Sequence, residues 1–119
     1  MELDSKVPIY IQIVSMVKKR IIYGHLKGGD RMPSVRDFAT ELKVNPNTIQ
    51  RVYTELENDN YIYTKRGIGK FVTEDASVIS KAREEIVSEA VVNFVRECKN
   101  LGLSLEEIIK IISDNYKED

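Results

Sequence analysis

SVRDFATELKVNPNTIQRVYTELEN, residues 34–58, holds two short amphipathic segments separated by a few residues. Ser34 and Asn45 stand where the segments begin, and their side chains can accept hydrogen bonds from the free backbone N–H groups of a first helical turn. Pro46 is favoured at the first position of a helix because the N–H that it lacks would have no partner there. The apolar residues of each segment recur at helical spacing. They are Val35, Phe38, Ala39 and Leu42 in the first segment and Ile49, Val52, Tyr53 and Leu56 in the second. The stretch therefore predicts a helix-turn-helix.

The outward face of the second helix is polar. It carries Asn47, Gln50, Arg51 and Thr54. Asn, Gln and Arg side chains have donors and acceptors that match base edges in a DNA major groove. A helix face that is merely solvated more often carries Glu and Lys, and that interpretation stays open for this helix taken alone.

Two β-prone runs follow the second helix. Residues 61–65, YIYTK, and residues 70–73, KFVT, are joined by RGIG at 66–69, whose glycines suit a hairpin turn. The basic residues at its tip are Lys65, Arg66 and Lys70. A helix-turn-helix followed by a basic hairpin is typical of a winged helix. Such a fold places its third helix in the major groove and its wing at the adjacent backbone or minor groove.

A further helix is predicted before this stretch, from Val7 to about Tyr23, with Gly24 as its end. Its apolar residues again recur at helical spacing. They are Tyr10, Ile13, Val14, Val17 and Ile21. In the loop that follows, Arg31 and Met32 could form a short strand against the wing.

Three strings of this sequence resemble the DNA-binding domain of GntR-family bacterial transcriptional regulators. They are PIYIQI at 8–13, GDRMPSVRDFATELKVNPNTIQRVYTELE at 29–57 and TKRGIGKFV at 64–72, and the short tail resembles the YtrA subfamily. One departure is Asp59-Asn60, where such sequences usually read Asp-Gly. Asn tolerates the left-handed conformation, so we expect the turn to be kept. The resemblance implies a winged helix, a repressor that can act on its own transcription unit, and a DNA contact by the arginine of PSVR, here Arg36.

The residues and the resemblance together give a set of candidate DNA-binding residues. Arg51, with Asn47 and Gln50, is expected to contact bases or adjacent phosphates. Arg66 is expected at the minor groove, where Gly67 allows close approach. The full set is Ser34, Arg36, Asn45, Asn47, Thr48, Gln50, Arg51, Lys65, Arg66, Gly67 and Lys70. The expected partner is double-stranded DNA.

Residues 76–119 form a second predicted unit of two helices, the first over about 77–100 and the second over about 104–116. Ser104 and Glu107 have the spacing of a capping box at the start of the second helix.

Apolar residues line one side of each tail helix. Two helices alone leave apolar surface uncovered, so the unit predicts a partner, most simply the same unit of a second chain in a two-fold homodimer. The expected interface is Ile86, Val87, Ala90, Val91, Phe94, Cys98, Leu105, Ile109 and Ile112. The alternative, in which both helices fold back onto the winged helix as core, stays open. So does the existence of a small-molecule effector, for which such a unit has little room except between subunits.

Composition and charge limit which fold classes and binding partners are expected. The 119 residues carry a net charge of −1. Residues 1–75 hold 12 Lys and Arg against 10 Asp and Glu, net +2, and residues 76–119 hold 6 against 9, net −3. The asymmetry favours nucleic acid at the N-terminal side. The predicted fold class is therefore mainly α with a small β-hairpin: a winged helix-turn-helix over 1–75 and a two-helix dimerisation hairpin, which could also take an effector, over 76–119.

Other classes of function find no support in the sequence. Cys98 is the single cysteine, which fits a reduced cytoplasmic protein. Its place on an apolar stripe predicts burial as a small hydrophobic residue, and the alternative is a redox sensor. His25 is the single histidine, so we expect no metal, no cofactor and no enzymatic activity. No signal segment and no membrane-spanning run is recognised. The remaining alternative is a winged helix used for protein contact, which would need an apolar patch on its third helix.

Overall fold

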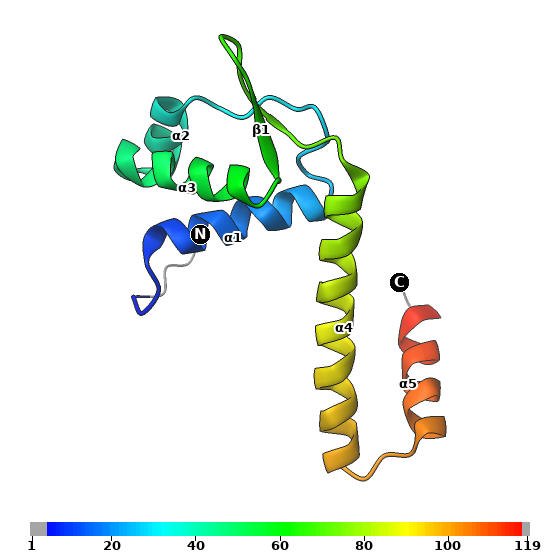
Figure 1. Ribbon diagram of the computed structural model, residues 1–119. Coiled ribbons are helices and arrows are strands. Elements are labelled where there is room, and N and C mark those ends of the chain that lie inside the picture. Colours follow the sequence, from blue (N-terminus) through cyan, green and yellow to red (C-terminus); the bar gives the residue numbers. More distant parts are fainter. Residues whose placement is uncertain (1–4, 118–119) are drawn as a thin grey trace. The chain divides into compact units, whose positions relative to one another are not determined.

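The computed structural model describes residues 5–117; residues 1–4, the start of the polar lead, and 118–119, the end of the tail, lie outside the described residues. The elements are α1 (Ile9–Ile22), α2 (Val35–Leu42), α3 (Pro46–Asn58), β1 (Ile62–Lys65), β2 (Gly69–Val72), α4 (Ala76–Asn100) and α5 (Leu105–Lys117) (Figure 1). The two strands pair antiparallel. The predicted class is confirmed: a mainly α protein with a winged helix-turn-helix formed by α2, α3 and the hairpin.

The starts of α2 and α3 are capped as the sequence predicts. Ser34 Oγ accepts from Asp37 N at 3.1 Å, and Asn45 Oδ1 accepts from Asn47 N at 2.8 Å. Between the two helices the chain turns at Lys43, which has a left-handed φ of 58°. Glycine or asparagine is more usual at such a position. Here backbone hydrogen bonds close the turn, from Lys43 N to Thr40 O at 3.3 Å and from Val44 N to Ala39 O at 3.0 Å.

The core of the winged helix is centred on α3, which packs against α1, α2 and β1. Its inward residues Ile49, Val52 and Leu56 are 0% exposed. Every residue predicted to face inward from the three helices belongs to this core or packs against it. The hydroxyl of Tyr53 donates to Pro33 O at 2.6 Å, which ties α3 to the segment before α2. The helix whose outward face is polar is therefore held rigidly from behind.

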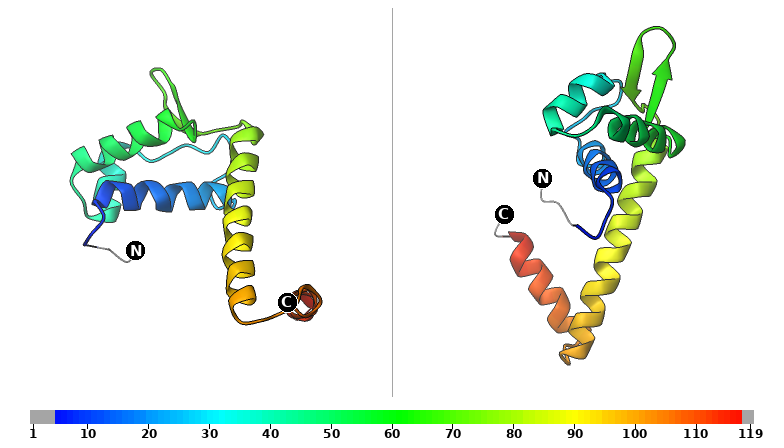
Figure 2. Two further views of the ribbon diagram at one scale, coloured as in Figure 1. Left: turned by 60° about the horizontal axis from the view of Figure 1, so that its bottom comes forward. Right: turned by 90° about the vertical axis from the view of Figure 1, so that its left-hand side faces the viewer.

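The wing is the β1–β2 hairpin, whose strands extend past α2 and α3 (Figure 2). Just before it, Asn60 has a φ of 65°, so the left-handed turn expected at this departure from glycine is kept. The predicted strand before α2 is a single bridge, with Arg31 opposite Phe71, and Met32 N donates to Lys70 O at 2.8 Å. The segment before α2 therefore borders the wing along β2.

The chain divides into two compact units, Met1–Ala82 and Arg83–Asp119. α4 starts at Ala76, where the sequence places the domain boundary. The first part of α4 belongs to the winged-helix unit because Ile79 packs against its core and Ala82 is buried.

The C-terminal unit has few buried side chains. The predicted capping box is confirmed, with Ser104 Oγ accepting from Glu107 N at 3.2 Å and Glu107 Oε1 accepting from Ser104 N at 3.0 Å. The hydrogen bond from Ser104 N, and to a lesser degree one from the Ser104 side chain, holds the pKa of the Glu107 carboxyl below its usual value. Gly102, with a φ of 80°, turns the chain between the helices. Cys98, as predicted, is buried, and so is Ile108, whereas most other apolar side chains of the unit are exposed.

Candidate nucleic-acid interface

The outward face of α3 is exposed along its length. Asn47, Gln50, Arg51 and Thr54 are all exposed, and Thr48 is half-buried. Thr54 Oγ1 donates to Gln50 O at 3.0 Å, so that hydroxyl proton is used within the helix. The side-chain amides of Asn47 and Gln50 have no hydrogen-bond partner among residues 5–117, which leaves their donors and acceptors available. α3, all of which the structure describes, has no large apolar side chain exposed. The patch that a protein-contact winged helix would need on its third helix is therefore missing.

Arg51 differs from its neighbours because its side chain lies against α1. Its Cζ is 3.7 Å from the centre of the Tyr10 ring, and its Nη2 donates to Tyr10 Oη at 3.0 Å. Tyr10 is half-buried and packs on the core. The sequence placed Tyr10 on an apolar stripe, but spacing within α1 carries no signal for a partner on α3.

The start of α2 contributes one unengaged cation. Ser34 and Asn45 use their side-chain oxygens as helix caps. Arg36 is exposed, and its guanidinium has no hydrogen bond or ion pair within the described part of the chain. Of these three candidate residues, Arg36 is thus the one whose side chain remains fully available to a ligand.

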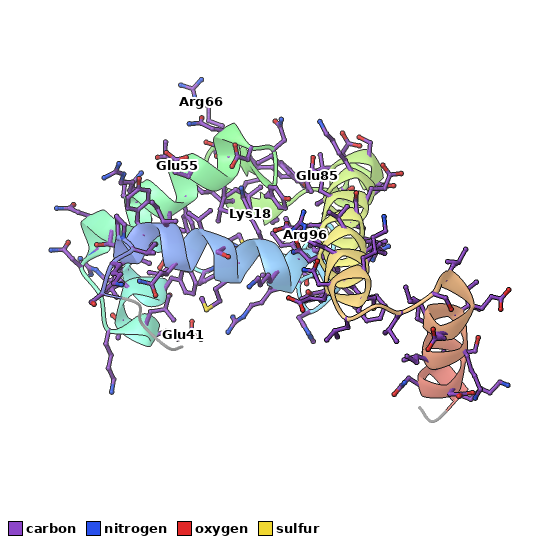
Figure 3. The ribbon with its side chains drawn as sticks, turned by 90° about the horizontal axis from the view of Figure 1, so that it is seen from below. Lys18, Glu41, Glu55, Arg66, Glu85 and Arg96 are labelled. Carbon is purple, nitrogen blue, oxygen red and sulfur yellow. The ribbon has the colours of Figure 1, made fainter. Side chains whose placement is uncertain are left out.

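The tip of the wing presents Lys65, Arg66 and Gly67 to solvent. Arg66 projects away from the fold (Figure 3), and no carboxylate among the described residues pairs with it. Lys65 Nζ lies 4.9 Å from the centre of the Phe71 ring. Gly67 has a φ of 78°, a conformation that favours glycine. A strongly solvated cation at the end of a narrow hairpin can reach a phosphate or a groove.

Lys70, in contrast, is engaged within the fold. Its Nζ lies 3.4 Å from Glu57 Oε1 and donates to Thr64 Oγ1 at 2.8 Å, while Thr64 donates to Glu57. The hydrogen bond from Thr64, together with the charge of Lys70, holds the pKa of the Glu57 carboxyl below its usual value. These bonds fasten both strands of the wing to the end of α3, and they offset the positive charge that Lys70 could offer to DNA.

Arg31 is a residue of this region that the sequence did not single out. Its Nη2 donates to Ile68 O in the wing at 2.6 Å. Gly69 lies so close that a Cβ there would be 3.2 Å from Arg31 Nε. Arg31 also lines a cavity of about 290 Å³ with Ser34 of the α2 start and Lys70 of the wing. The only sequence signal was its place in the predicted short strand, so its side-chain role required the structure.

Over residues 5–117, no three His, Cys, Asp or Glu side chains gather in a way that could hold a metal ion. Within the same range, no helix combines the length and apolar character needed to cross a membrane.

Comparison with known proteins agrees with this geometry. The model of the family described as bacterial regulatory proteins, gntR family, matches residues 9–72. The chain is 39% identical to the HTH-type transcriptional regulator YhcF of Bacillus subtilis, over 92% of this chain and 90% of that protein. It is 35% identical to the HTH-type transcriptional repressor YtrA of the same bacterium, over 95% of this chain and 90% of that protein. A GntR family transcriptional regulator from Listeria monocytogenes has a similar structure, with a TM-score of 0.76 at 43% identity, covering 94% of this chain and 98% of that one.

Proposed function

This chain belongs to the GntR family of bacterial regulatory proteins and is a DNA-binding transcriptional regulator similar to YtrA; from that premise we propose that it is a repressor that binds a two-fold symmetric operator as a homodimer. Its relatives are transcriptional regulators rather than enzymes. The name of YtrA as a repressor supports repression here. The protein acts in the cytoplasm, where bacterial DNA lies.

The observation that carries the proposal is the outward face of α3. Asn47 and Gln50 present unengaged amides there, and such amides pair with adenine edges in the major groove. α3 enters the groove, while the wing lies at the adjacent backbone or minor groove with Arg66 at its tip. Arg36 at the start of α2 contacts DNA at the border of the same site.

The homodimer rests on the apolar surface of the C-terminal unit. Eight of the nine residues predicted for the interface are exposed, and the ninth, Cys98, is buried. Val87 is 60% exposed and Leu105 is 70% exposed. Apolar side chains that gather in one exposed patch usually mark an interaction site. In a two-fold dimer the same patch of each subunit covers its copy, so that one set of residues completes both units.

Selection from random-sequence duplexes by the purified full-length chain, followed by gel shift, tests this function. We expect enrichment of an inverted repeat whose half-sites are spaced by about one helical turn, roughly 34 Å, as two-fold symmetry of the protein requires. Sedimentation at the same concentration should give a dimer. Selection that enriches no sequence would contradict specific readout and favour the protein-contact winged helix. Enrichment of a single asymmetric half-site would contradict the dimeric arrangement.

A further inference from the structure

The contact between Arg51 and Tyr10 joins two helices whose residues are 41 positions apart in the sequence. The guanidinium is stacked on the ring and hydrogen-bonded to the hydroxyl. Two contacts of different kinds to one side chain fix its position more narrowly than either could alone. Arg51 is therefore held in place before any DNA arrives.

The direction in which Arg51 is held follows from the geometry of α3. With about 3.6 residues per turn, Gln50 and Arg51 lie on opposite flanks of the outward face. Gln50 shares its flank with Glu57, which bonds to the wing. Arg51 lies on the flank toward α1, where Tyr10 meets it.

A major groove is about 12 Å wide and admits one helix. When α3 occupies the groove, α1 remains outside it, and a side chain turned onto α1 lies at the border of the groove, where the phosphates are. A guanidinium has five N–H donors, and the hydroxyl of Tyr10 takes one of them, at Nη2. The remaining donors form the planar fork that suits a phosphate.

We propose that Tyr10 is a positioning residue for DNA binding, which holds Arg51 at the α1 side of α3 so that its guanidinium contacts a backbone phosphate rather than a base. The inference rests on the proposed function and narrows it, because it assigns base contacts and phosphate contacts to different residues of the outward face of α3. Asn47 and Gln50 read bases, whereas Arg51 sets the position of the helix on the backbone. Pre-ordering by Tyr10 lowers the entropy that the long Arg51 side chain loses on binding.

The test measures binding of the full-length chain to the selected operator and to a random duplex over a range of salt concentrations. Loss of one phosphate contact lowers the slope of log K against log salt by about 0.9 per bound subunit. We expect this change for Arg51→Ala on both duplexes, with the ratio of operator to random affinity kept within about twofold. A slope left unchanged, with relaxed preference at one operator position, would show that Arg51 reads a base and would overturn the proposal.

The role of Tyr10 is tested by asking whether the effect of its substitution on DNA affinity depends on the presence of Arg51. Tyr10→Leu should weaken binding to both duplexes several-fold in the wild-type background and have almost no effect in the Arg51→Ala background. Tyr10→Phe, which keeps the ring, should restore most of the loss. Effects of Tyr10→Leu and Arg51→Ala that simply add would contradict the positioning role. Should Tyr10→Leu fail to fold, the smaller loss caused by Tyr10→Phe must likewise vanish when Arg51 is absent.

Tyr61 offers a matched control. It too is half-buried, packs on the same core and has a cation over its ring, with Lys18 Nζ 5.0 Å from the centroid. Tyr61→Leu should leave the affinity for both duplexes unchanged; an affinity loss equal to that of Tyr10→Leu would mean that core packing alone explains the result. Because affinity and salt slope are also measured on random duplex, the positioning of Arg51 by Tyr10 is tested even if the chain shows no operator preference, an outcome that would contradict the proposed function alone.

Discussion

The winged-helix unit and the C-terminal unit share one pattern of apolar spacing but differ in where the apolar side chains lie. In the winged helix, Ile13, Ile49 and Leu56 are 0% exposed. In the C-terminal unit, Val87 is 60% and Leu105 is 70% exposed. Helical spacing indicates which side chains share a face. It does not indicate what covers that face.

The difference has a simple physical cause. α3 is covered by α1, α2 and β1, so its apolar face has partners within the unit. The C-terminal unit consists of α5 and most of α4, and two helices offer each other one narrow contact. The first unit is therefore expected to be stable alone, and the second to depend on another copy of the chain.

Removal of the C-terminal unit should lower the affinity for the operator more than any single substitution does. A fragment ending at Ala82, the limit of the first compact unit, should fold and run as a monomer. Two linked half-site contacts gain about 10² to 10⁴ in affinity, so the fragment should lose roughly 3 to 5 kcal/mol on the selected operator at fixed salt. Sedimentation and titration measure both quantities. A fragment that stays dimeric with unchanged operator affinity would place the dimer interface in the winged helix.

Truncation of one leucine in each unit sharpens the comparison. Leu56→Ala should cost about 3 kcal/mol of unfolding free energy at any protein concentration, because it leaves a cavity in a closed core. Leu105→Ala should cost less than about 0.5 kcal/mol in dilute solution, where the side chain is exposed, and more once the protein dimerises. Urea unfolding over a range of protein concentrations separates the two. Equal, concentration-independent losses would show that Leu105 is covered within its own chain.

The sequence predicted those features of the fold that depend on local chemistry. The caps at Ser34 and Asn45 follow from side-chain oxygens near free N–H groups, and Asn60 follows from the tolerance of asparagine for positive φ. The bridge of Arg31 to β2 follows from a short extended segment beside the hairpin. The helix-turn-helix and the wing could therefore be placed almost residue by residue.

Side-chain partners that come from different elements could not be predicted. Lys70 was assigned to DNA by its charge, yet the packing of the wing on α3 brings it to Glu57. Tyr10 was assigned to the core, yet its hydroxyl and ring also hold Arg51. Such pairs depend on the angle and offset between elements, which periodicity within one element does not contain.

A charge placed on α4 tests which face of that helix is covered. Val91 and Val92 are each 52% exposed, but only Val91 lies on the predicted interface stripe. Val91→Glu should weaken the dimer by about 2 kcal/mol, since a carboxylate would be buried without a partner. Val92→Glu, the matched control, should sediment as the wild type does. A folded Val91→Glu variant that is still dimeric at micromolar concentration would place the interface elsewhere.

Acid should destabilise both units slightly, through Glu57 in the first and Glu107 in the second, and only Glu57 should also affect DNA binding. Both carboxyls have pKa values below their ordinary 4.5, Glu57 through Thr64 and Lys70 and Glu107 through Ser104. A group whose pKa is lowered in the folded state contributes stability that is present above the unfolded value of 4.5 and is lost as the pH falls through the folded value.

Glu57→Gln should therefore lower the unfolding free energy at pH 7, and the gap from wild type should close as the pH falls below about 4. The loss should stay under about 1 kcal/mol, because the Glu57 side chain is 39% exposed and solvent screens the pair. The same variant removes the carboxylate that offsets Lys70, so DNA binding at low salt should be equal or tighter while stability falls. Glu107→Gln is the control, with a similar acid response and unchanged binding by the winged helix. Thermal unfolding and duplex titration across pH 3 to 7 give both readouts; a gap that persists at about pH 3 would show that Glu57 supports the wing by packing rather than by charge.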